Sequence, residues 1–379
     1  MTFYQSSIFK PKICPGCQEE KHYSSTIGLC RECLLNISTQ DIIELSQKIH
    51  TKVRAIYKNL PNLPPRDEGY TCHLCANHCK IAENSRGYCG VRRIKNGQFT
   101  GATSETAILS FYSDHHPTNC CNSWVCPGGS ATSSFSVSPG VERGFSNLSV
   151  FFHGCNFNCL FCQNASHKDI NDFNLTTVEE LVKVVLQEPK FTCVCFFGGS
   201  PEPHIEFTIN FGKLLLEELP KDRIVRLCWE WNGAGNPKFI DQVCELALLS
   251  GGNVKFDLKA SSEKLAYILT GQSNRSVLRN FERLVSKYYD QRVLLPVITA
   301  TTLLVSYYIE SQEVSNLAHL IASLRSDLPY SLLAFHPDYF LSDLPNTPWE
   351  QAQNAYNETK PLLSRVKVGN THLFRKPIA

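Results

Sequence analysis

The sequence lacks an excess of charge of either sign, a long apolar run and an apolar leader. Lys and Arg number 37 against 35 Asp and Glu, and a net charge of +2 is too small to hold a nucleic acid or an anionic membrane. No apolar run approaches the roughly 20 residues that a membrane span needs, and residues 1–12 contain no stretch of signal-peptide length. We therefore expect a soluble, cytoplasmic protein with neither a nucleic acid nor a membrane as partner.

Methionine is also scarce, with one residue, whereas cysteine is abundant, with 18 residues in a chain of 379. Many cysteines lie two or three residues apart, too close to bridge comfortably with one another. In a long chain without a secretion signal, such spacings favour metal binding over disulfides. The cysteines form groups at Cys14, Cys17, Cys30 and Cys33, at Cys72, Cys75, Cys79 and Cys89, at Cys120, Cys121 and Cys126, and at Cys155, Cys159 and Cys162, with Cys193, Cys195, Cys228 and Cys244 scattered.

Residues 1–38 contain two Cys-x-x-Cys pairs separated by twelve residues. This spacing is typical of a zinc ribbon, in which two tight turns aim four thiolates at one ion. Such a module more often stabilises itself or binds a protein partner than performs chemistry. We predict a zinc-ribbon-like module whose ligands are Cys14, Cys17, Cys30 and Cys33.

Residues 39–68 change character. Apolar residues recur at helical spacing from Ile42 to Leu60, and Ser38, Thr39 or Asp41 is available as an N-cap. Prolines from Pro61 onward end that pattern and stiffen the chain. We predict an amphipathic helix followed by a proline-rich linker.

Residues 69–147 are rich in Gly, Ser, Thr and Cys and carry few helical signals. We expect a Cys-rich metal-binding region of loops and short strands. Four thiolates suit zinc and an iron–sulfur cluster equally well, and a metal-free arrangement is also open. The candidate ligands are Cys72, Cys75, Cys79 and Cys89.

Residues 148–379 alternate strand-like and helix-like runs. Strands are predicted at 148–152, 191–197, 225–231, 254–258, within 293–304 and at 331–335, and helices at 207–219, 237–249, 277–288, 314–324 and 349–363, with one more after a capping box at Thr176 and Glu179. Six such units predict an α/β fold, a full or partial (β/α)6 barrel. Active sites of such folds lie at the carboxyl ends of the strands.

The motif Cys155-Asn-Phe-Asn-Cys159-Leu-Phe-Cys162 directly follows the first predicted strand of this region. Three thiolates at this spacing can ligate three irons of a cubane and leave the fourth iron open for substrate chemistry. The alternative is a structural zinc that takes a fourth ligand such as His153, although structural zinc normally draws its ligands from two local pairs.

This CxxxCxxC pattern, with aromatic Phe161 before its last cysteine, resembles the signature of the radical S-adenosylmethionine (SAM) superfamily. The resemblance extends over roughly residues 148–370. It implies a 4Fe–4S cluster on the three cysteines, SAM at the open iron, and reductive cleavage of SAM to methionine and a 5′-deoxyadenosyl radical that abstracts hydrogen from a substrate. It also implies reduced ferredoxin or flavodoxin as electron donor.

Glycines and polar residues follow four of the predicted strands, where the fold places function. The first such site resembles the family's GGE motif, although Ser200 takes the acidic position and Glu202 follows two residues later. A plain turn, an ion pair at the barrel mouth and a structural histidine are the alternative interpretations of these residues. The cofactor-binding residues that the resemblance implies are Gly198, Gly199, Glu202, Asn232, Asp257, Lys259, His336 and Phe161.

The lead-in CxLCxxxC…GxCGVR before the barrel resembles the radical-SAM component of the AmmeMemoRadiSam system and proteins like pyruvate formate-lyase-activating enzyme. This second resemblance implies a protein or peptide as a possible substrate. The alternative function is non-enzymatic, an iron–sulfur electron-transfer or scaffold protein with zinc modules for docking. A carrier of that kind needs no glycine pair and no polar residues at successive strand ends.

Seven cysteines stay outside these predicted sites. Adjacent Cys120 and Cys121 cannot easily both ligate one metal, although one extra ligand or a redox-active pair is conceivable. Cys193 and Cys195 share one face of a strand, and a buried cysteine packs as a small hydrophobic residue. We expect idle or core thiols at Cys120, Cys121, Cys126, Cys193, Cys195, Cys228 and Cys244.

Overall fold

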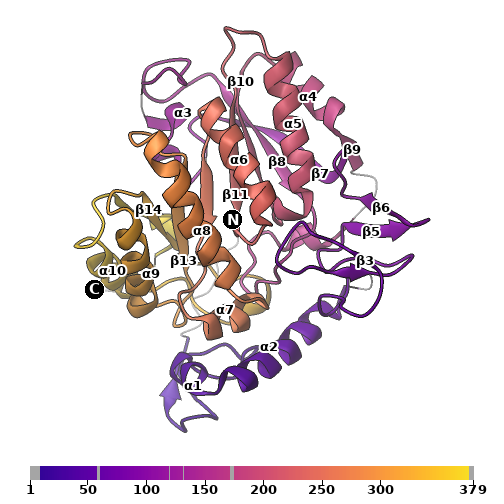
Figure 1. The fold of residues 1–379 in the computed structure, drawn as a ribbon. Helices are drawn as coiled ribbons and strands as arrows, with labels where there is room; N and C mark the ends of the chain where they lie inside the picture. The colour runs from indigo at the N-terminus through magenta and orange to yellow at the C-terminus, as the bar shows by residue number, and fades with distance from the viewer. Residues whose placement is uncertain (1–8, 58–59, 119, 131, 171–174, 375–379) are drawn as a thin grey trace, which may run out of the picture.

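A computed structural model of the chain describes residues 9–57, 60–118, 120–130, 132–170 and 175–374 (Figure 1). Its centre is a nine-stranded sheet with the strand order β15-β14-β13-β12-β11-β10-β8-β7-β9. The parallel part of this sheet consists of β8 (Ser146–Phe152), β10 (Phe191–Gly198), β11 (Arg226–Trp231), β12 (Val254–Asp257), β13 (Ile298–Leu304), β14 (Tyr330–Ala334) and β15 (Val366–Gly369).

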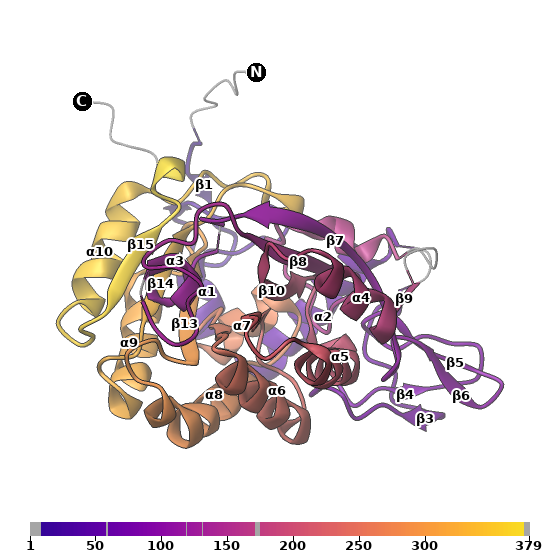
Figure 2. The ribbon, with the colours of Figure 1, turned by 90° about the horizontal axis from the view of Figure 1, so that it is seen from above.

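Helices connect these strands and, apart from α7, which lies below the sheet in Figure 1, are outside the arc that the sheet forms when it is seen from above (Figure 2). They are α4 (Val178–Gln187), α5 (Ile205–Glu218), α6 (Pro237–Ser250), α7 (Glu263–Thr270), α8 (Arg275–Tyr288), α9 (Ser311–Leu324) and α10 (Trp349–Thr359). Strands β15 and β9 stand at opposite ends of the strand order, so the sheet is an open arc. The predicted α/β architecture, a partial barrel, is confirmed.

The six predicted strands of the barrel are present, but β7 (Thr106–His115) was not predicted. It pairs antiparallel with β8 and with β9 (Leu175–Thr177) and makes the sheet mixed. Its buried residues run consecutively from Ala107 to Leu109 and are followed by exposed Phe111 and Tyr112. This pattern shows neither strand alternation nor a continuous apolar run, and therefore gives no strand signal.

The capping box of α4 lies one residue later than predicted. Thr177 accepts the backbone N–H of Glu180, whose side chain in turn accepts the N–H of Thr177. Thr176 and Thr177 both belong to β9, and they pair with Ala107 and Thr106 of β7. Thr177 is the last residue of that strand, and the helix begins directly after it, which places the cap one residue after Thr176.

The predicted amphipathic helix is α2 (Thr39–Arg54), with Ser38 as its N-cap, and it ends several residues before the predicted end. Arg54 is buried at that end. Its guanidinium donates hydrogen bonds of 2.6 Å to the carbonyls of Pro61 and Tyr88 and stacks on the Tyr88 ring. These bonds tie the end of the helix to the linker and to the Cys-rich region.

The other amino-terminal elements are short. They are β1 (Lys12–Ile13), β2 (Glu20–Lys21), α1 (Arg31–Asn36), β3 (Tyr70–Thr71), β4 (Lys80–Ile81), β5 (Arg92–Lys95) and β6 (Gln98–Gly101), and each strand pair is an antiparallel hairpin. In Figure 1, α1 and α2 lie below the sheet, next to α7. The Cys-rich region thus folds into loops and short strands, as predicted, apart from β7.

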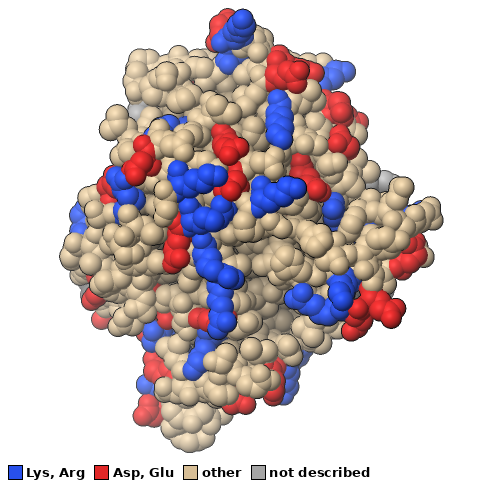
Figure 3. Space-filling model, in the orientation of Figure 1, with Lys and Arg blue, Asp and Glu red and all other residues tan. Residues whose placement is uncertain are grey.

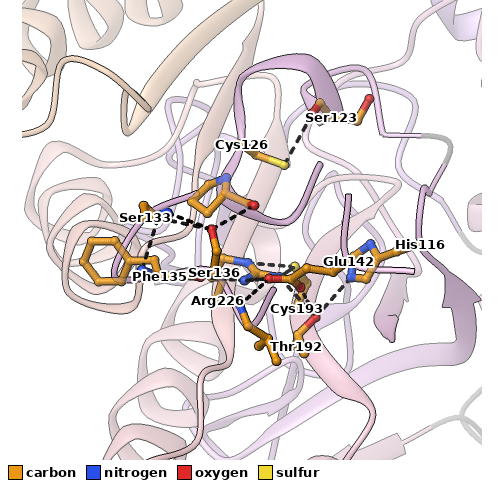
Figure 4. A network of polar contacts seen from close by, with 12 residues as sticks. His116, Ser123, Cys126, Ser133, Phe135, Ser136, Glu142, Thr192, Cys193 and Arg226 are labelled. Atoms are coloured by element: carbon orange, nitrogen blue, oxygen red, sulfur yellow. Dashed lines mark hydrogen bonds and ion pairs between the residues drawn. The ribbon is translucent and has the colours of Figure 1, made fainter. Parts of the chain in front are cut away.

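The chain between β7 and β8, residues 116–145, crosses the amino ends of β10 and β11 and contains α3 (Pro127–Ser130). We call it the closing segment, and the structure describes it apart from residues 119 and 131. An ion pair anchors it, because Glu142 accepts hydrogen bonds of 2.8 and 2.5 Å from Arg226 at the start of β11 (Figure 4). Both side chains are buried, with exposed fractions of 0 and 1%.

The charges on the surface are mixed in sign. On the face shown in Figure 3, Lys and Arg side chains form a line over α8, interrupted by acidic residues. Arg275 of that line pairs with Glu263, and Arg283 pairs with Asp241. No helix among the described residues is long and apolar enough to cross a membrane.

Glu142→Gln should lower the free energy of unfolding by about 3 kcal/mol, because it leaves the buried Arg226 charge without its carboxylate. Burial acts to raise the pKa of Glu142, but Arg226 outweighs it and lowers that pKa. The stabilisation is therefore present above the unfolded pKa of about 4.3 and is lost as the pH falls through the lower folded pKa.

Urea denaturation at neutral pH and near pH 3 measures this effect. The control is Arg275→Ala, which breaks an exposed pair with Glu263 and should change stability by less than about 1 kcal/mol. Equal midpoints for Glu142→Gln and the unaltered protein at neutral pH would contradict the assigned role of the buried pair.

Candidate functional site

A cavity of about 460 Å³ lies where the parallel strands end. Because those strands run in the same direction, their carboxyl ends and the loops that follow them meet at one rim. The carboxyl ends of strands β10 to β14 contribute lining residues, which are Gly198, Trp231, Asp257, Leu303 and Leu333. This is the position at which the barrel prediction places function.

All three cysteines of the predicted cluster motif, Cys155, Cys159 and Cys162, line this cavity. Their loop follows β8, and backbone hydrogen bonds fix it at its middle. The N–H groups of Asn158 and Leu160 donate to carbonyls at the end of α7, at 2.8 and 2.9 Å. Three sulfurs thus reach the cavity from a loop that is anchored on a neighbouring helix.

These three thiols do not converge on a single point. Among the described residues, only one group brings three or more ligand atoms within 4.8 Å of one another, and it is the amino-terminal group described below. A tetrahedral zinc with bonds of about 2.3 Å holds its sulfurs within roughly 4 Å of one another. A cluster, whose irons occupy separate corners, needs more widely spaced thiolates. The three barrel thiols are therefore spaced more widely than the amino-terminal group.

Two lysines supply positive charge beside the cysteines. Lys168 is buried and donates a 2.8 Å hydrogen bond to Asn158. Burial lowers its pKa, and the nearby cysteines oppose that shift. Burial also acts to lower the pKa of Lys259, but Asp257, followed by Cys159, raises it. Both cations favour thiolates. Sequence analysis missed Lys168, because no pattern links it to the cysteine motif.

The glycine pair after β10 lies against the cysteine loop. Gly198 and Gly199 both line the cavity, and the Gly199 N–H donates to the Phe152 carbonyl at 2.9 Å. A Cβ added at Gly199 would overlap the carbonyl oxygen of Gly154, the residue before the first cysteine. This position therefore requires glycine, so that the backbones after β8 and β10 can approach each other.

Ser200, and not Glu202, lines the cavity in this region. The Glu202 carboxylate is buried, accepts the Gly233 N–H at 2.7 Å and contacts the Ser200 hydroxyl. Asn232 lines the cavity and donates to Asn156 at 2.7 Å and to Ser200 at 2.9 Å. Glu202 thus holds the loop after β11, whereas Ser200 and Asn232 face the cavity.

Two polar atoms at the cavity have no partner among the described residues. They are Nε1 of Trp231 and Nδ1 of His167, and both side chains line the cavity. An indole N–H is a donor only, so Trp231 offers a hydrogen bond to a ligand. Strand alternation alone does not identify the side of the sheet that is hollow, so the sequence did not indicate this role for Trp231.

Phe161, Asp257 and Lys259 also line the cavity, and the Lys259 ammonium lies over the Phe161 ring at 5.4 Å. Asp257 and Lys259 form an ion pair with each other, as one of the alternative interpretations expects. His336 is not among the lining residues described for this cavity, and its Nδ1 lies 4.0 Å from the Asp338 carboxylate. The structure therefore brings together six of the eight predicted cofactor-binding residues, without Glu202 and His336.

The second cysteine group surrounds a small cavity of about 10 Å³ lined by Cys72, Cys75, Cys79 and Cys89. The backbone of Cys75 forms an isolated antiparallel β-bridge with Gly235 in the loop after β11. The Asn236 side chain donates a hydrogen bond to the His73 carbonyl at 2.8 Å. No three of the four sulfurs lie within 4.8 Å of one another among the described residues. The structure thus gathers these thiols beside the loop that carries Asn232.

The amino-terminal group is the tightest. The ligand atoms of Cys14, Cys17, Cys30 and Cys33 all lie within 4.8 Å of one another and could hold a metal ion. Burial acts to raise the pKa of Cys14, but backbone N–H donors at Cys30, Cys17 and Gly16 outweigh it and lower the pKa to about 6. The module docks on the barrel, since Ser24 and Ser25 donate to Asp343 and Thr26 donates to the Phe340 carbonyl.

Comparison with known proteins agrees with this geometry. Residues 149–306 match the family model described as the radical SAM superfamily, and the chain therefore contains a radical SAM domain. An uncharacterized protein of Methanocaldococcus jannaschii is 24% identical over 318 residues, which cover 80% of this chain and 82% of that protein. The pyruvate formate-lyase-activating enzyme of Clostridium pasteurianum is 27% identical over 195 residues, 49% of this chain and 74% of that enzyme.

Solved structures show more distant likenesses. A domain of a pyruvate-formate lyase-activating enzyme from Bacteroides vulgatus is 18% identical, with a TM-score of 0.37, over 47% of this chain and 98% of that one. SuiB of Streptococcus suis, bound to its precursor peptide SuiA, is 12% identical with a TM-score of 0.44 over 58% of this chain. This chain spans about half of SuiB, 47% of its length.

Glu202→Ala should destabilise the protein by about 1–3 kcal/mol, because the buried Gly233 N–H and Ser200 hydroxyl lose their acceptor. Glu202→Gln keeps an oxygen at that place. Burial raises the pKa of Glu202, so its ionisation disfavours folding as the pH rises from the unfolded pKa of about 4.3 through the folded one.

Thermal unfolding of both variants between about pH 4 and pH 8 tests this role. The glutamine variant should match the unaltered protein at the acidic end and gain on it as the pH rises. A glutamine variant as unstable as the alanine variant across the range would mean that the carboxylate charge itself is needed.

Proposed function

We propose that the protein is a radical SAM enzyme that binds a 4Fe–4S cluster on Cys155, Cys159 and Cys162 and cleaves S-adenosylmethionine reductively. The observation that carries the proposal is the convergence of these cysteines, Gly199 and Asn232 on one cavity. A reduced cluster held there would supply the electron for cleavage of SAM to methionine and a 5′-deoxyadenosyl radical, which would abstract hydrogen from the substrate.

The protein's own residues would orient SAM and balance charge. Ser200 and Asn232 offer oxygen acceptors to the ammonium group of SAM at the rim, and the Trp231 N–H offers a donor. Lys259 and Lys168 stabilise negative charge on the thiolates.

We further propose that the substrate is a protein or peptide and that reduced ferredoxin or flavodoxin donates the electron. The support for the substrate class is the similarity to an enzyme whose name states that it activates pyruvate formate-lyase. The substrate and the donor would approach at the rim of the barrel, where the cavity lies.

The two amino-terminal cysteine groups are proposed metal sites. Four sulfurs within 4.8 Å match the closed tetrahedral geometry of structural zinc, which we assign to Cys14, Cys17, Cys30 and Cys33. The Cys72, Cys75, Cys79 and Cys89 site is proposed to hold zinc or an iron–sulfur cluster. Both modules contact loops of the cavity rim and would stabilise its position.

Cys159→Ala should abolish formation of 5′-deoxyadenosine from SAM, because two thiolates do not retain the cluster in a substrate-accessible form. The reaction is run without oxygen, with dithionite as reductant, on protein reconstituted with iron and sulfide. The control is Cys244→Ala, a buried cysteine of α6 that should keep the activity.

Formation of 5′-deoxyadenosine by Cys159→Ala at the control rate would refute the site. An unaltered protein with an intact cluster that releases no 5′-deoxyadenosine would instead favour an electron carrier. The two outcomes therefore separate a wrong site from a wrong function.

Cys17→Ala should release about one zinc per chain, because structural zinc needs all four of its ligands. Elemental analysis of purified protein measures zinc, and Cys244→Ala again serves as control. Iron on the barrel cysteines should be retained in Cys17→Ala. A zinc content that is the same in Cys17→Ala and the control would contradict the assignment of the ligands.

A further inference from the structure

A second cavity of about 160 Å³ lies beside the first, toward the amino ends of the strands, and five cysteines are among its lining residues. The two cavities share Tyr112, Phe197 and Glu230 as lining residues. The cysteines of this second cavity, which we call the thiol cavity, are Cys120, Cys126, Cys193, Cys195 and Cys228. Sequence analysis predicted idle or core thiols at all five positions.

The sheet places three of these thiols on its inner face. Cys193 and Cys195 are two residues apart on β10, so their side chains point to the same side, roughly 7 Å apart along the strand. Cys195 pairs with Cys228 on the parallel neighbour β11, roughly 5 Å away. Three cysteines thus form a triangle on two adjacent strands.

The closing segment brings two more thiols over this triangle. Cys126 precedes α3, and its thiol faces the Ser123 carbonyl at 3.8 Å (Figure 4). Cys193 and Cys228 are close enough to Cys126 to influence one another's ionisation. Cys120 instead contacts Glu230, with 3.6 Å between its sulfur and a carboxylate oxygen. The Cys120 thiol is thus engaged as a hydrogen-bond donor, and it is not counted as a ligand.

The cavity is too wide for one ion. A single water needs about 10–15 Å³, so 160 Å³ leaves room for a group of several atoms. No three of these sulfurs lie within 4.8 Å of one another among the described residues, whereas a zinc holds its sulfurs within roughly 4 Å. Spaced thiols around a wide cavity suit a cluster of several irons.

Hydrogen-bond donors lie beside one of the sulfurs. The Arg226 guanidinium, which is paired with Glu142, also donates to the Cys193 sulfur from two nitrogens, at 3.2 and 3.1 Å (Figure 4). Four thiolates on a cluster carry excess negative charge, and hydrogen bonds to their sulfurs stabilise it.

We propose that the thiol cavity binds an iron–sulfur cluster ligated by Cys126, Cys193, Cys195 and Cys228, in addition to the cluster of the barrel rim. Two ligands come from β10, one from β11 and one from the closing segment. The cluster is held at the amino ends of the strands, away from the SAM position, with Tyr112, Phe197 and Glu230 between the two cavities. All four irons have a protein ligand there, so this cluster binds no SAM.

The test uses the full chain with the other candidate iron sites removed. The parent variant carries Cys155→Ala, Cys159→Ala, Cys162→Ala, Cys72→Ala and Cys75→Ala, and is reconstituted with iron and sulfide without oxygen. It should retain about four irons and four sulfides per chain and a cluster signal by Mössbauer spectroscopy. Adding Cys195→Ala and Cys228→Ala should remove that iron, whereas adding Cys244→Ala, which is equally buried but on α6, should not.

A parent that retains no iron, or zinc in its place, would overturn the proposal, as would equal iron with and without Cys195 and Cys228. Circular dichroism and the zinc content of the amino-terminal module show whether each variant is folded. If the last variant is misfolded, the test moves to the chain that is unaltered elsewhere. There Cys228→Ser alone should lose about four of the total irons. The rim site should keep its own cluster and continue to cleave SAM. An unchanged iron total in that variant would overturn the proposal without bearing on the rim site.

Discussion

The parallel register of β8 and β10 to β14 is the constraint on which the rest of the structure depends. Because these strands share one direction, every loop after a strand reaches the same rim, and residues far apart in the sequence meet there. The cysteine loop after β8 and the glycines after β10 can touch only because Gly199 carries no Cβ to strike the Gly154 carbonyl. One backbone contact thus joins the two loops that the proposed chemistry needs most.

Local signals predicted much of this arrangement. The barrel strands, the start of α2 and the cysteine loop follow from patterns that lie within a dozen residues. The errors in the predicted helix ends arise where residues distant in the sequence make contacts at those ends. Strand β9 pairs with β7 as far as Thr177, where α4 is capped, and Arg54 at the end of α2 donates to the carbonyls of Pro61 and Tyr88. Neither of these long-range contacts can be predicted from the residues next to the helix ends.

The same limit applies to the candidate site. Residue type and position at the strand ends predicted that Asn232 and Lys259 lie at the cavity. They did not predict that the Glu202 side chain points away from the cavity and accepts the Gly233 N–H. The Trp231 N–H and Lys168 were missed because orientation toward a hollow is a property of the closed sheet. A sequence pattern can indicate which residues share one face of a strand. What lies opposite that face depends on the curvature of the sheet and on the closing segment.

The inner face of the sheet differs from the interior of an ordinary barrel. Large branched apolar side chains usually fill the interior of such a barrel. Here the amino-terminal half of that interior is lined by cysteines, together with Asn147 and Ser149. The buried pair between Glu142 and Arg226 holds the closing segment across it. Polar groups and cavities in a core reduce stability unless a ligand or partner fills them. An interior of this kind is therefore better explained by a bound group than by packing.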